Sequence, residues 1–340
     1  MSGWFEDLFG FAEGSWEETR AHFALEGETL RSRANERRFG VGRFATPTLA
    51  ELRQATAGAR PGTLRVRHEV VGDALALHGD PAQAGALFQV ASQHNCLEFP
   101  GPETVPEDGI TEYEDDPTQG PACALAAAPA TVFRNYFVPL GDHEGQRRDR
   151  QVDTLGALRA HLGEDLVDMV NGYAESDPAR LAALRERMAG EDADALRARV
   201  GIGLQRGVEV VYGQRYVPLE ATHRVSQAFC SAIACAYSAA RVAEWEPLAR
   251  IVLEASYEAT LLAAVLDAAE GQGSGRVWLT FLGGGAFGNP KAWIAEAMVR
   301  ALRVAREREL DVRIAHHQRL DEGLVATLAD TGLEAELSRP

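Results

Sequence analysis

Runs of apolar residues with the length and pattern of β-strands recur along the chain, and segments with helical spacing separate most of them. Alternating or continuous apolar positions predict strands at 63–71, 74–78, 87–91, 276–282 and 310–316, and two short strands about a Gly-Gln turn within 208–219. Helical spacing, with capping or proline signals, predicts helices near 15–25, 46–57, 120–130, 151–200, 222–238, 247–269, 291–305 and 324–330. This alternation predicts an α/β fold, a three-layer α/β/α sandwich around a mixed sheet.

Two segments stand apart from the predicted sandwich. Residues 1–60 are predicted to form a helical extension that packs on the core, and the turn sequence ARPG at 59–62 ends it. The helical stripe over 151–200 is predicted to be an insertion that acts as a lid for substrate recognition. Residues 61–340 then form the main domain, interrupted by this insertion.

The composition restricts the partners. A formal charge of -16 argues against a nucleic-acid backbone or an anionic membrane, because like charges repel. The four cysteines lack metal-ligand spacing and are predicted to be small buried residues, so we expect neither a metal nor a cofactor. The acidic N-terminal sequence lacks the basic start and apolar core of a signal peptide, and we expect a cytoplasmic protein.

One candidate site follows the predicted strand at 87–91. A polar cluster, Ser92 to Asn95, lies at the strand end, where side chains can meet a ligand. A loop then carries only acidic charged residues: Glu103, Glu107, Asp108, Glu112, Glu114, Asp115 and Asp116. Such a run is usually a solvated loop. We favour a functional loop because long ordered loops in compact domains tend to be functional.

Glycine-rich segments follow both the acidic loop and a later strand. Gly120 and Pro121 begin a helix whose first N–H groups favour an anion. The segment GGGAFGNP, 283–290, follows the apolar strand at 276–282, and its successive N–H groups can form an anion-binding nest for a diphosphate. It lacks the Lys-Ser/Thr pair of a P-loop. Asp73, in a Gly-Asp pair, is either a turn residue or an acceptor for the exocyclic amine of a base.

These motifs together resemble a known family. The order VVGDALAL, ALFQVASQHN, QGPACA and VWLTFLGGGAFGNP resembles a macrodomain, an ADP-ribose-binding α/β/α module. The resemblance covers about residues 63–316 and implies that Asp73 contacts adenine, that Asn95 and Gly120 hold the distal ribose, and that the late glycine loop holds the diphosphate. The residues that match these places are Asp73, Asn95, Gly120, Gly284, Gly285, Ala286, Phe287 and Gly288, and the neighbouring Gln119, Gly283 and Asn289 complete the candidate ligand-binding set.

The departures from the usual macrodomain pattern point to a divergent branch of the macrodomain family. Instead of Asn-Ala-Ala-Asn the chain has VASQHN, and instead of a multi-glycine catalytic loop it has the acidic segment and TQGPAC. With PEDG, NYF and HRVSQAFCSA, this combination resembles the divergent macrodomains that hydrolyse ADP-ribosylated arginine, including bacterial effectors that act on ADP-ribosylated ubiquitin. The implied partners are ADP-ribose and an arginine-ADP-ribosylated protein, with ubiquitin as a candidate.

Cleavage of an N-glycosidic bond to arginine suits a carboxylate-rich site. Carboxylates can activate water, stabilise an oxocarbenium-like state and pair with a guanidinium. The main candidates are Asp108 and Asp116, followed by Glu107 and Asp115; which is the base and which binds guanidinium stays open. The alternatives are a non-catalytic reader of ADP-ribose or of ADP-ribosylated protein, and a hydrolase of another nucleoside-diphosphate compound.

Overall fold

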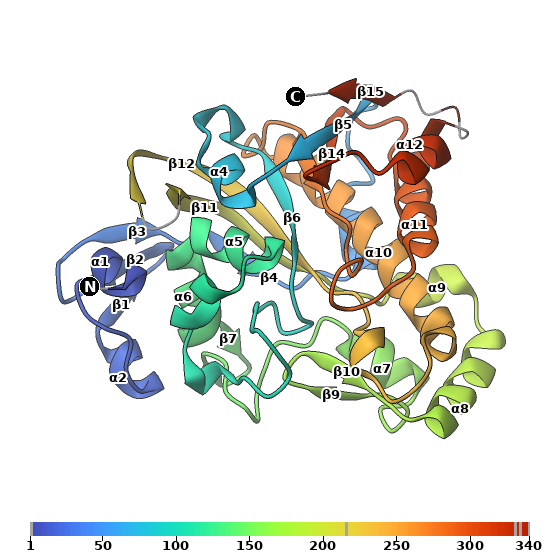
Figure 1. The fold of residues 1–340 in the computed structure, drawn as a ribbon, viewed down its shortest axis with the longest axis horizontal. Coiled ribbons are helices and arrows are strands. Elements are labelled where there is room, and N and C mark those ends of the chain that lie inside the picture. The colour runs from blue at the N-terminus through green and yellow to red at the C-terminus, as the bar shows by residue number, and fades with distance from the viewer. Residues whose placement is uncertain (1–2, 215–216, 330–331, 333–334, 339–340) are drawn as a thin grey trace.

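An eight-stranded mixed sheet forms the centre of the computed structural model, which describes residues 3–214, 217–329, 332 and 335–338 (Figure 1). The strand order is β15 (Ala335–Ser338), β5 (Leu64–Val71), β14 (Leu310–His317), β13 (Arg276–Leu279), β6 (Leu87–Ala91), β12 (Val217–Cys230), β11 (Gly203–Gln214) and β4 (Arg43–Ala45). Neighbours from β15 to β12 pair in parallel, whereas β11 and β4 pair antiparallel. The carboxyl ends of the parallel strands therefore share one edge.

Helices cover both faces of this sheet (Figure 1). One face packs on α3 (Leu49–Ala55), α10 (Val242–Ala269), α11 (Lys291–Val304) and α12 (Glu322–Ala329), and the other on α4 (Ala74–Gly79), α5 (Gln119–Ala126) and α6 (Ala128–Tyr136). Successive residues of a strand point to opposite faces of the sheet and pack into different hydrophobic cores. Leu87 and Val277 lie in the core under α10, whereas Phe88 and Trp278 lie in the core under α5 and α6. The predicted α/β/α sandwich around a mixed sheet is confirmed. Among the described helices, none has the length and apolar character to cross a membrane.

The N-terminal segment contains strands as well as helices. Beyond α3 and β4, its elements are α1 (Trp4–Phe9), α2 (Trp16–Ala21) and a small antiparallel sheet of β1 (Phe23–Glu26), β2 (Thr29–Ser32) and β3 (Arg38–Gly40). The sequence predicted helices alone, because strands this short offer too few positions to show a period. Helix α3 lies within the predicted helix, but Thr48 caps it: Thr48 Oγ1 accepts a hydrogen bond from the Glu51 N–H.

The segment 151–200 is also mixed. It contains α7 (Gly156–Leu162), a hairpin of β9 (Asp168–Val170) and β10 (Tyr173–Glu175), α8 (Pro178–Ala189) and α9 (Ala193–Arg197). The remaining short elements are the hairpin β7 (Pro139–Leu140) and β8 (His143–Glu144), and the 3₁₀ turns η1 (Pro81–Gln83), η2 (Pro106–Asp108), η3 (Thr111–Asp115) and η4 (Cys235–Tyr237). The helical stripe seen in the sequence is real, but a hairpin interrupts it.

Two predicted elements are wrong in type. The segment 74–78 is helix α4, because the Asp73 side chain caps it where the sequence suggested a turn between strands. Most of the predicted helix at 222–238 is strand β12, which is continuously buried from Val225 to Cys230. A short apolar run of this kind cannot be distinguished from a buried helix by periodicity.

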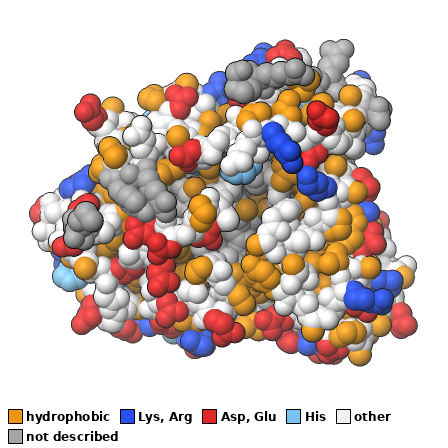
Figure 2. Space-filling view, in the orientation of Figure 1, with side chains coloured by type: hydrophobic (Ala, Val, Ile, Leu, Met, Phe, Trp, Pro, Cys, Tyr) orange, Lys and Arg blue, Asp and Glu red, His pale blue; other side chains and the backbone are white. Residues whose placement is uncertain are grey.

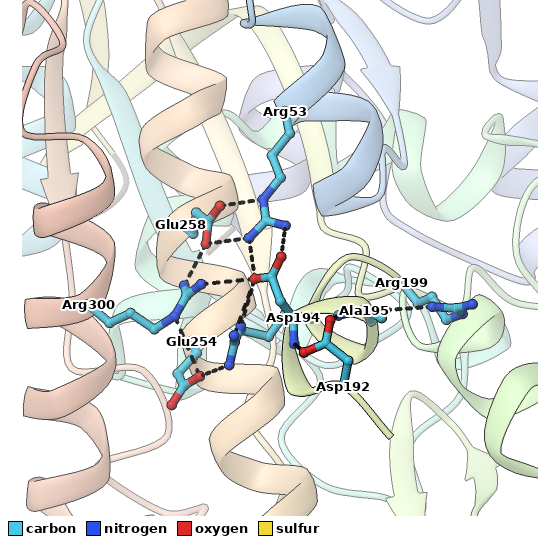
Figure 3. Close-up of polar contacts among 9 residues, drawn as sticks. Arg53, Asp192, Asp194, Ala195, Arg199, Glu254, Glu258 and Arg300 are labelled. Carbon is cyan, nitrogen blue, oxygen red and sulfur yellow. Dashed lines mark hydrogen bonds and ion pairs between the residues drawn. The ribbon is translucent and has the colours of Figure 1, made fainter. Parts of the chain in front are cut away.

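An ion-pair network ties together the helices α3, α9, α10 and α11 (Figure 3). Glu258 of α10 is buried and accepts hydrogen bonds from Arg53 Nε (2.6 Å) and Arg300 Nη1 (2.5 Å). Asp194 of α9 accepts two hydrogen bonds from Arg53, at 2.8 and 2.9 Å, and its guanidinium neighbours lower the pKa of Asp194 to about 2. Glu254 joins the network through Arg197. Each charge thus has an opposite partner, which a buried carboxylate requires.

We expect Glu258→Gln to lower the free energy of unfolding by about 2–4 kcal/mol, because it leaves Arg53 and Arg300 without their shared buried anion. Urea denaturation measures this change. The matched control is Glu296→Gln, which removes an exposed partner of Arg250 and should cost less than about 1 kcal/mol. Equal losses for the two variants would contradict the role of the network.

Candidate functional site

A cavity of about 910 Å³ lies at the edge where the parallel strands end. Its walls come from the ends of β5, β6, β13 and β14, from α4 and α5, from the acidic loop and from the glycine loop. Figure 2 shows the surface hollowed near its centre, with acidic side chains gathered beside the hollow. Ligands of parallel sheets bind at this edge, so the cavity is the candidate site.

Close contact between α5 and β6 sets one wall of the cavity. A Cβ at Gly120 would stand 2.0 Å from the Ala91 carbonyl oxygen, so no other residue fits there without a shift. Gln119 fastens the same contact, since its Oε1 accepts from the Ala91 N–H and its Nε2 donates to the Gln89 carbonyl, both at 2.9 Å. Gln119 and Gly120 both line the cavity.

Asp73 lies at another part of the cavity wall, at the start of α4. Its Oδ1 accepts hydrogen bonds from the N–H groups of Leu75 (2.8 Å) and Ala76 (3.3 Å). The carboxylate is therefore held in place by helix capping and lines the cavity at the same time. The predicted contact with adenine stays a prediction.

The glycine loop follows β13 and returns to α11. Gly283 has φ of 72°, and a Cβ there would stand 2.4 Å from the Ala232 Cβ. The loop is closed by hydrogen bonds from the Gly288 N–H to the Gly285 carbonyl and from the Asn289 N–H to the Gly283 carbonyl, both at 3.0 Å. Asn289 is buried and donates through Nδ2 to the Ile233 carbonyl at 2.8 Å. Glycine is needed here for conformation and for close packing.

The middle of this loop lies on the cavity wall and has backbone N–H groups without a protein acceptor among the described residues. Gly285, Ala286 and Phe287 line the cavity, and within the described residues none of their backbone N–H groups donates a hydrogen bond to the protein. A Cβ at Gly285 would meet only open space. Successive N–H groups of this kind can bind an anion such as a phosphate.

The acidic loop contributes Glu114 and Asp116 to the cavity wall. Asp116 is half-buried, and its Oδ1 accepts a hydrogen bond from the Thr118 N–H at 2.8 Å, just before α5 begins. Of the four carboxylates predicted to be catalytic, Asp116 is thus the one that the structure brings to the cavity. Glu114, which the sequence did not single out, lies beside it on η3.

The other predicted carboxylates do not line the cavity in the described structure. Asp108 is exposed, and its Oδ2 accepts from the Val105 N–H at 2.9 Å within its own 3₁₀ turn. Glu107 accepts from the Arg148 N–H at 3.0 Å, and Asp115 is exposed. Their catalytic roles stay predictions.

Asn95 has a structural environment rather than a place on the cavity wall. It is buried, donates through Nδ2 to Gln151 Oε1 at 2.9 Å and accepts from the Leu97 N–H at 3.0 Å. These bonds hold a turn in which Cys96 has φ of 62°. Ser92 and Gln93, earlier in the same polar cluster, line the cavity instead.

Glu98 is a cavity residue that sequence reasoning missed. It is buried, its Oε2 lies 3.4 Å from Arg134 Nη2, and its Oε1 accepts no hydrogen bond within the described residues. Burial raises the pKa of Glu98 to about 7, against the opposing effect of Arg134. The sequence did contain a signal for a buried ion pair. Glu98 stands within the apolar sequence CLEFP, and Arg134 stands within the apolar sequence ATVFRNYF.

Three aromatic rings line another part of the wall. Tyr173, Tyr237 and Phe287 have ring centroids 5.7 to 5.9 Å apart and come from β10, η4 and the glycine loop. Gln93 Nε2 donates to the Tyr173 hydroxyl at 3.2 Å. The segment 151–200 therefore supplies a side chain to the cavity.

Titratable side chains do not form a metal centre in the described part of the chain. No group of three or more His, Cys, Asp or Glu residues there has the arrangement to hold a metal ion. Cys96, Cys123, Cys230 and Cys235 are buried thiols, as predicted.

Comparisons with known proteins add structural similarities. No protein-family model and no curated protein matches the chain. Poly(ADP-ribose) glycohydrolase from Deinococcus radiodurans in complex with ADP-ribose is similar, with 14% identity and a TM-score of 0.44 over 86% of this chain and 95% of that chain. A mutant of the poly(ADP-ribose) glycohydrolase from Thermomonospora curvata has 13% identity and a TM-score of 0.43 over 92% of this chain and 95% of that chain. At these TM-scores the likeness assigns no activity to this chain.

We expect Glu98→Gln to change the pH dependence of stability. With its pKa raised from 4.5 to about 7, Glu98 holds its proton in the folded protein where the unfolded chain releases it. Its contribution to stability is thus fully present below pH 4.5 and is lost as the pH rises through 7. As the pH rises from 4.5 to 7, the free energy of unfolding of the variant should therefore increase by about 3 kcal/mol relative to that of wild type.

Urea denaturation of both proteins across this pH range measures the gain. Glu112→Gln, which changes an exposed acid of the neighbouring loop, controls for the loss of one charge. A wild-type-minus-variant difference that stays constant with pH would contradict the raised pKa.

Proposed function

We propose that this protein is a hydrolase that binds ADP-ribose and cleaves the N-glycosidic bond between ADP-ribose and arginine side chains of modified proteins. The observation that carries the proposal is that Asp116 lines the same cavity as the open N–H groups of Gly285, Ala286 and Phe287. An anion-binding loop and a carboxylate thus share one site. This combination suits a glycosidic substrate that carries a diphosphate.

Binding would use the glycine loop and the start of α4. The diphosphate would accept hydrogen bonds from the N–H groups of the glycine loop, and the adenine would lie near Asp73. The cavity volume of about 910 Å³ is within the range of small-molecule sites. The distal ribose would then lie toward α5 and the acidic loop.

Cleavage would use the carboxylates of the acidic loop. Asp116 would accept a proton from water as the water oxygen attacks the anomeric carbon, and the C–N bond electrons would leave with the guanidine. The guanidine would take up the proton that Asp116 removed from water, which regenerates the carboxylate. Glu114 lies on the same wall and would pair with the cationic guanidinium. Both carboxylates would also stabilise positive charge that develops on the ribose.

A non-catalytic reader is the second candidate, and one observation favours it. Asp108, Glu107 and Asp115 do not line the cavity in the described structure, so fewer predicted carboxylates reach the ligand than a hydrolase of the predicted kind would use. A reader would need only the glycine loop and the adenine end of the cavity.

Release of free ADP-ribose distinguishes the two candidates. The substrates are arginine-ADP-ribosylated ubiquitin, serine-linked and glutamate-linked ADP-ribosyl proteins, and poly(ADP-ribose), and chromatography measures the product. We expect arginine-selective release, and we expect Asp116→Asn to lower kcat by roughly a hundredfold or more because it removes the general base. The matched control, Glu112→Gln, changes an exposed acid of the same loop and should retain activity.

Each other outcome has a defined meaning. Tight ADP-ribose binding without release from any substrate would support a reader. Release from poly(ADP-ribose) alone would contradict arginine selectivity, and absence of both binding and release would contradict the proposed site.

A further inference from the structure

Glu13, in the N-terminal segment, contacts the loop that carries the cavity carboxylates. Its carboxylate accepts hydrogen bonds from the N–H groups of Ile110 (2.9 Å) and Thr111 (2.7 Å). It also accepts from Thr111 Oγ1 at 2.5 Å and from the Tyr136 hydroxyl at 2.6 Å. Residues distant in the sequence thus converge on one side chain.

The loop backbone is shaped around this carboxylate. Gly109 has φ of 85°, and a Cβ there would stand 2.5 Å from Glu13 Oε2. A second N-terminal residue, Trp4, donates through Nε1 to the Thr111 carbonyl at 2.9 Å. The turn from Gly109 to Thr111 is therefore bound to the N-terminal segment through two of its N–H groups, those of Ile110 and Thr111, and through the Thr111 carbonyl.

This attachment leads directly to the cavity. Thr111 begins η3, which carries Glu114 and is followed by Asp116. Within η3, the Tyr113 hydroxyl accepts a hydrogen bond from the Glu98 N–H at 3.0 Å. Glu13 fixes the start of the turn, and the contact with Glu98 fixes its middle. Because η3 is a single short turn, movement at Thr111 would displace the carboxylates after it.

The chemistry of these contacts requires a carboxylate. An ionised carboxylate accepts hydrogen bonds through both oxygens and donates none, so it can satisfy several N–H and O–H groups at once. Burial raises the pKa of Glu13, and the bonds from Thr111, Tyr136 and Ile110 oppose this rise. A glutamine in its place would turn an NH₂ group toward some of the same donors.

We propose that Glu13 is a positioning residue, which sets the place of Glu114 and Asp116 in the cavity through the backbone of residues 109–111. This inference rests on the proposed function, because it assigns to Glu13 an effect on the hydrolytic step. It also gives the N-terminal segment a part in the active site. The diphosphate end of the cavity lies on other elements, so ligand binding does not depend on Glu13.

The test compares Glu13→Gln with Glu6→Gln, which makes the same charge change at an exposed position of α1. We expect Glu13→Gln to lower kcat on arginine-ADP-ribosylated protein by roughly ten- to a hundredfold, because small displacements of reacting groups are costly. The Kd for free ADP-ribose, measured by calorimetry, should change by less than about threefold. The diphosphate end of the cavity lies on elements that Glu13 does not contact. Glu6→Gln should match wild type in both measurements.

Amide hydrogen exchange supplies a readout that needs no activity. In Glu13→Gln, residues 110–116 should exchange faster, whereas the glycine loop should keep its wild-type rates. If Glu13→Gln does not fold, Thr111→Val removes one donor to Glu13 and keeps the backbone N–H, and it should show a smaller loss of the same kind.

Two results would overturn the inference. The first is that kcat and the exchange of residues 110–116 are both unchanged in Glu13→Gln and in Thr111→Val. The second is that Glu13→Gln loses ADP-ribose affinity and kcat equally, which indicates general unfolding. If wild type binds ADP-ribose and releases none, the proposed function fails, and faster exchange at 110–116 would still support the attachment of the loop.

Discussion

The contact between Gly120 and the Ala91 carbonyl is the constraint on which the site depends. It brings the start of α5 to the end of β6 with no space for a Cβ, and Gln119 secures it with two hydrogen bonds. The acidic loop ends immediately before this helix, so Asp116 must lie at the strand edge. The parallel order of β5, β14, β13 and β6 then brings Asp73 and the glycine loop to the same edge. Backbone geometry thus gathers distant segments at one cavity.

Charge is distributed according to this geometry. The chain has a formal charge of -16, yet the glycine loop on the cavity wall has N–H groups without a protein acceptor among the described residues, and local donors of this kind can bind a phosphate within an acidic protein. The acidic loop lines another part of the same cavity. Away from it, the buried carboxylate of Glu258 is matched by arginines, as folding stability requires. The proposed ligand, with a diphosphate at one end and a cation at the other, would complement this arrangement.

The sequence predicted the α/β/α sandwich and several central strands because these features depend on local pattern. The strands at 64–71 and 310–317 lie where apolar alternation placed them. The choice of cavity carboxylates depends on contacts that the pattern does not encode: Asp108 turns back to cap its own turn, whereas Glu114 lies on the cavity wall. Glu98 is buried against Arg134, a partner 36 residues away. Composition indicates an acidic loop, but tertiary contacts decide which acids line the cavity.

The most direct test of this account is a crystal structure of the protein with ADP-ribose bound. The account predicts phosphate oxygens within about 3.2 Å of the backbone nitrogens of Gly285, Ala286 or Phe287, with the anomeric carbon of the distal ribose facing Asp116. ADP-ribose bound in the reverse direction, or bound outside this cavity, would contradict it.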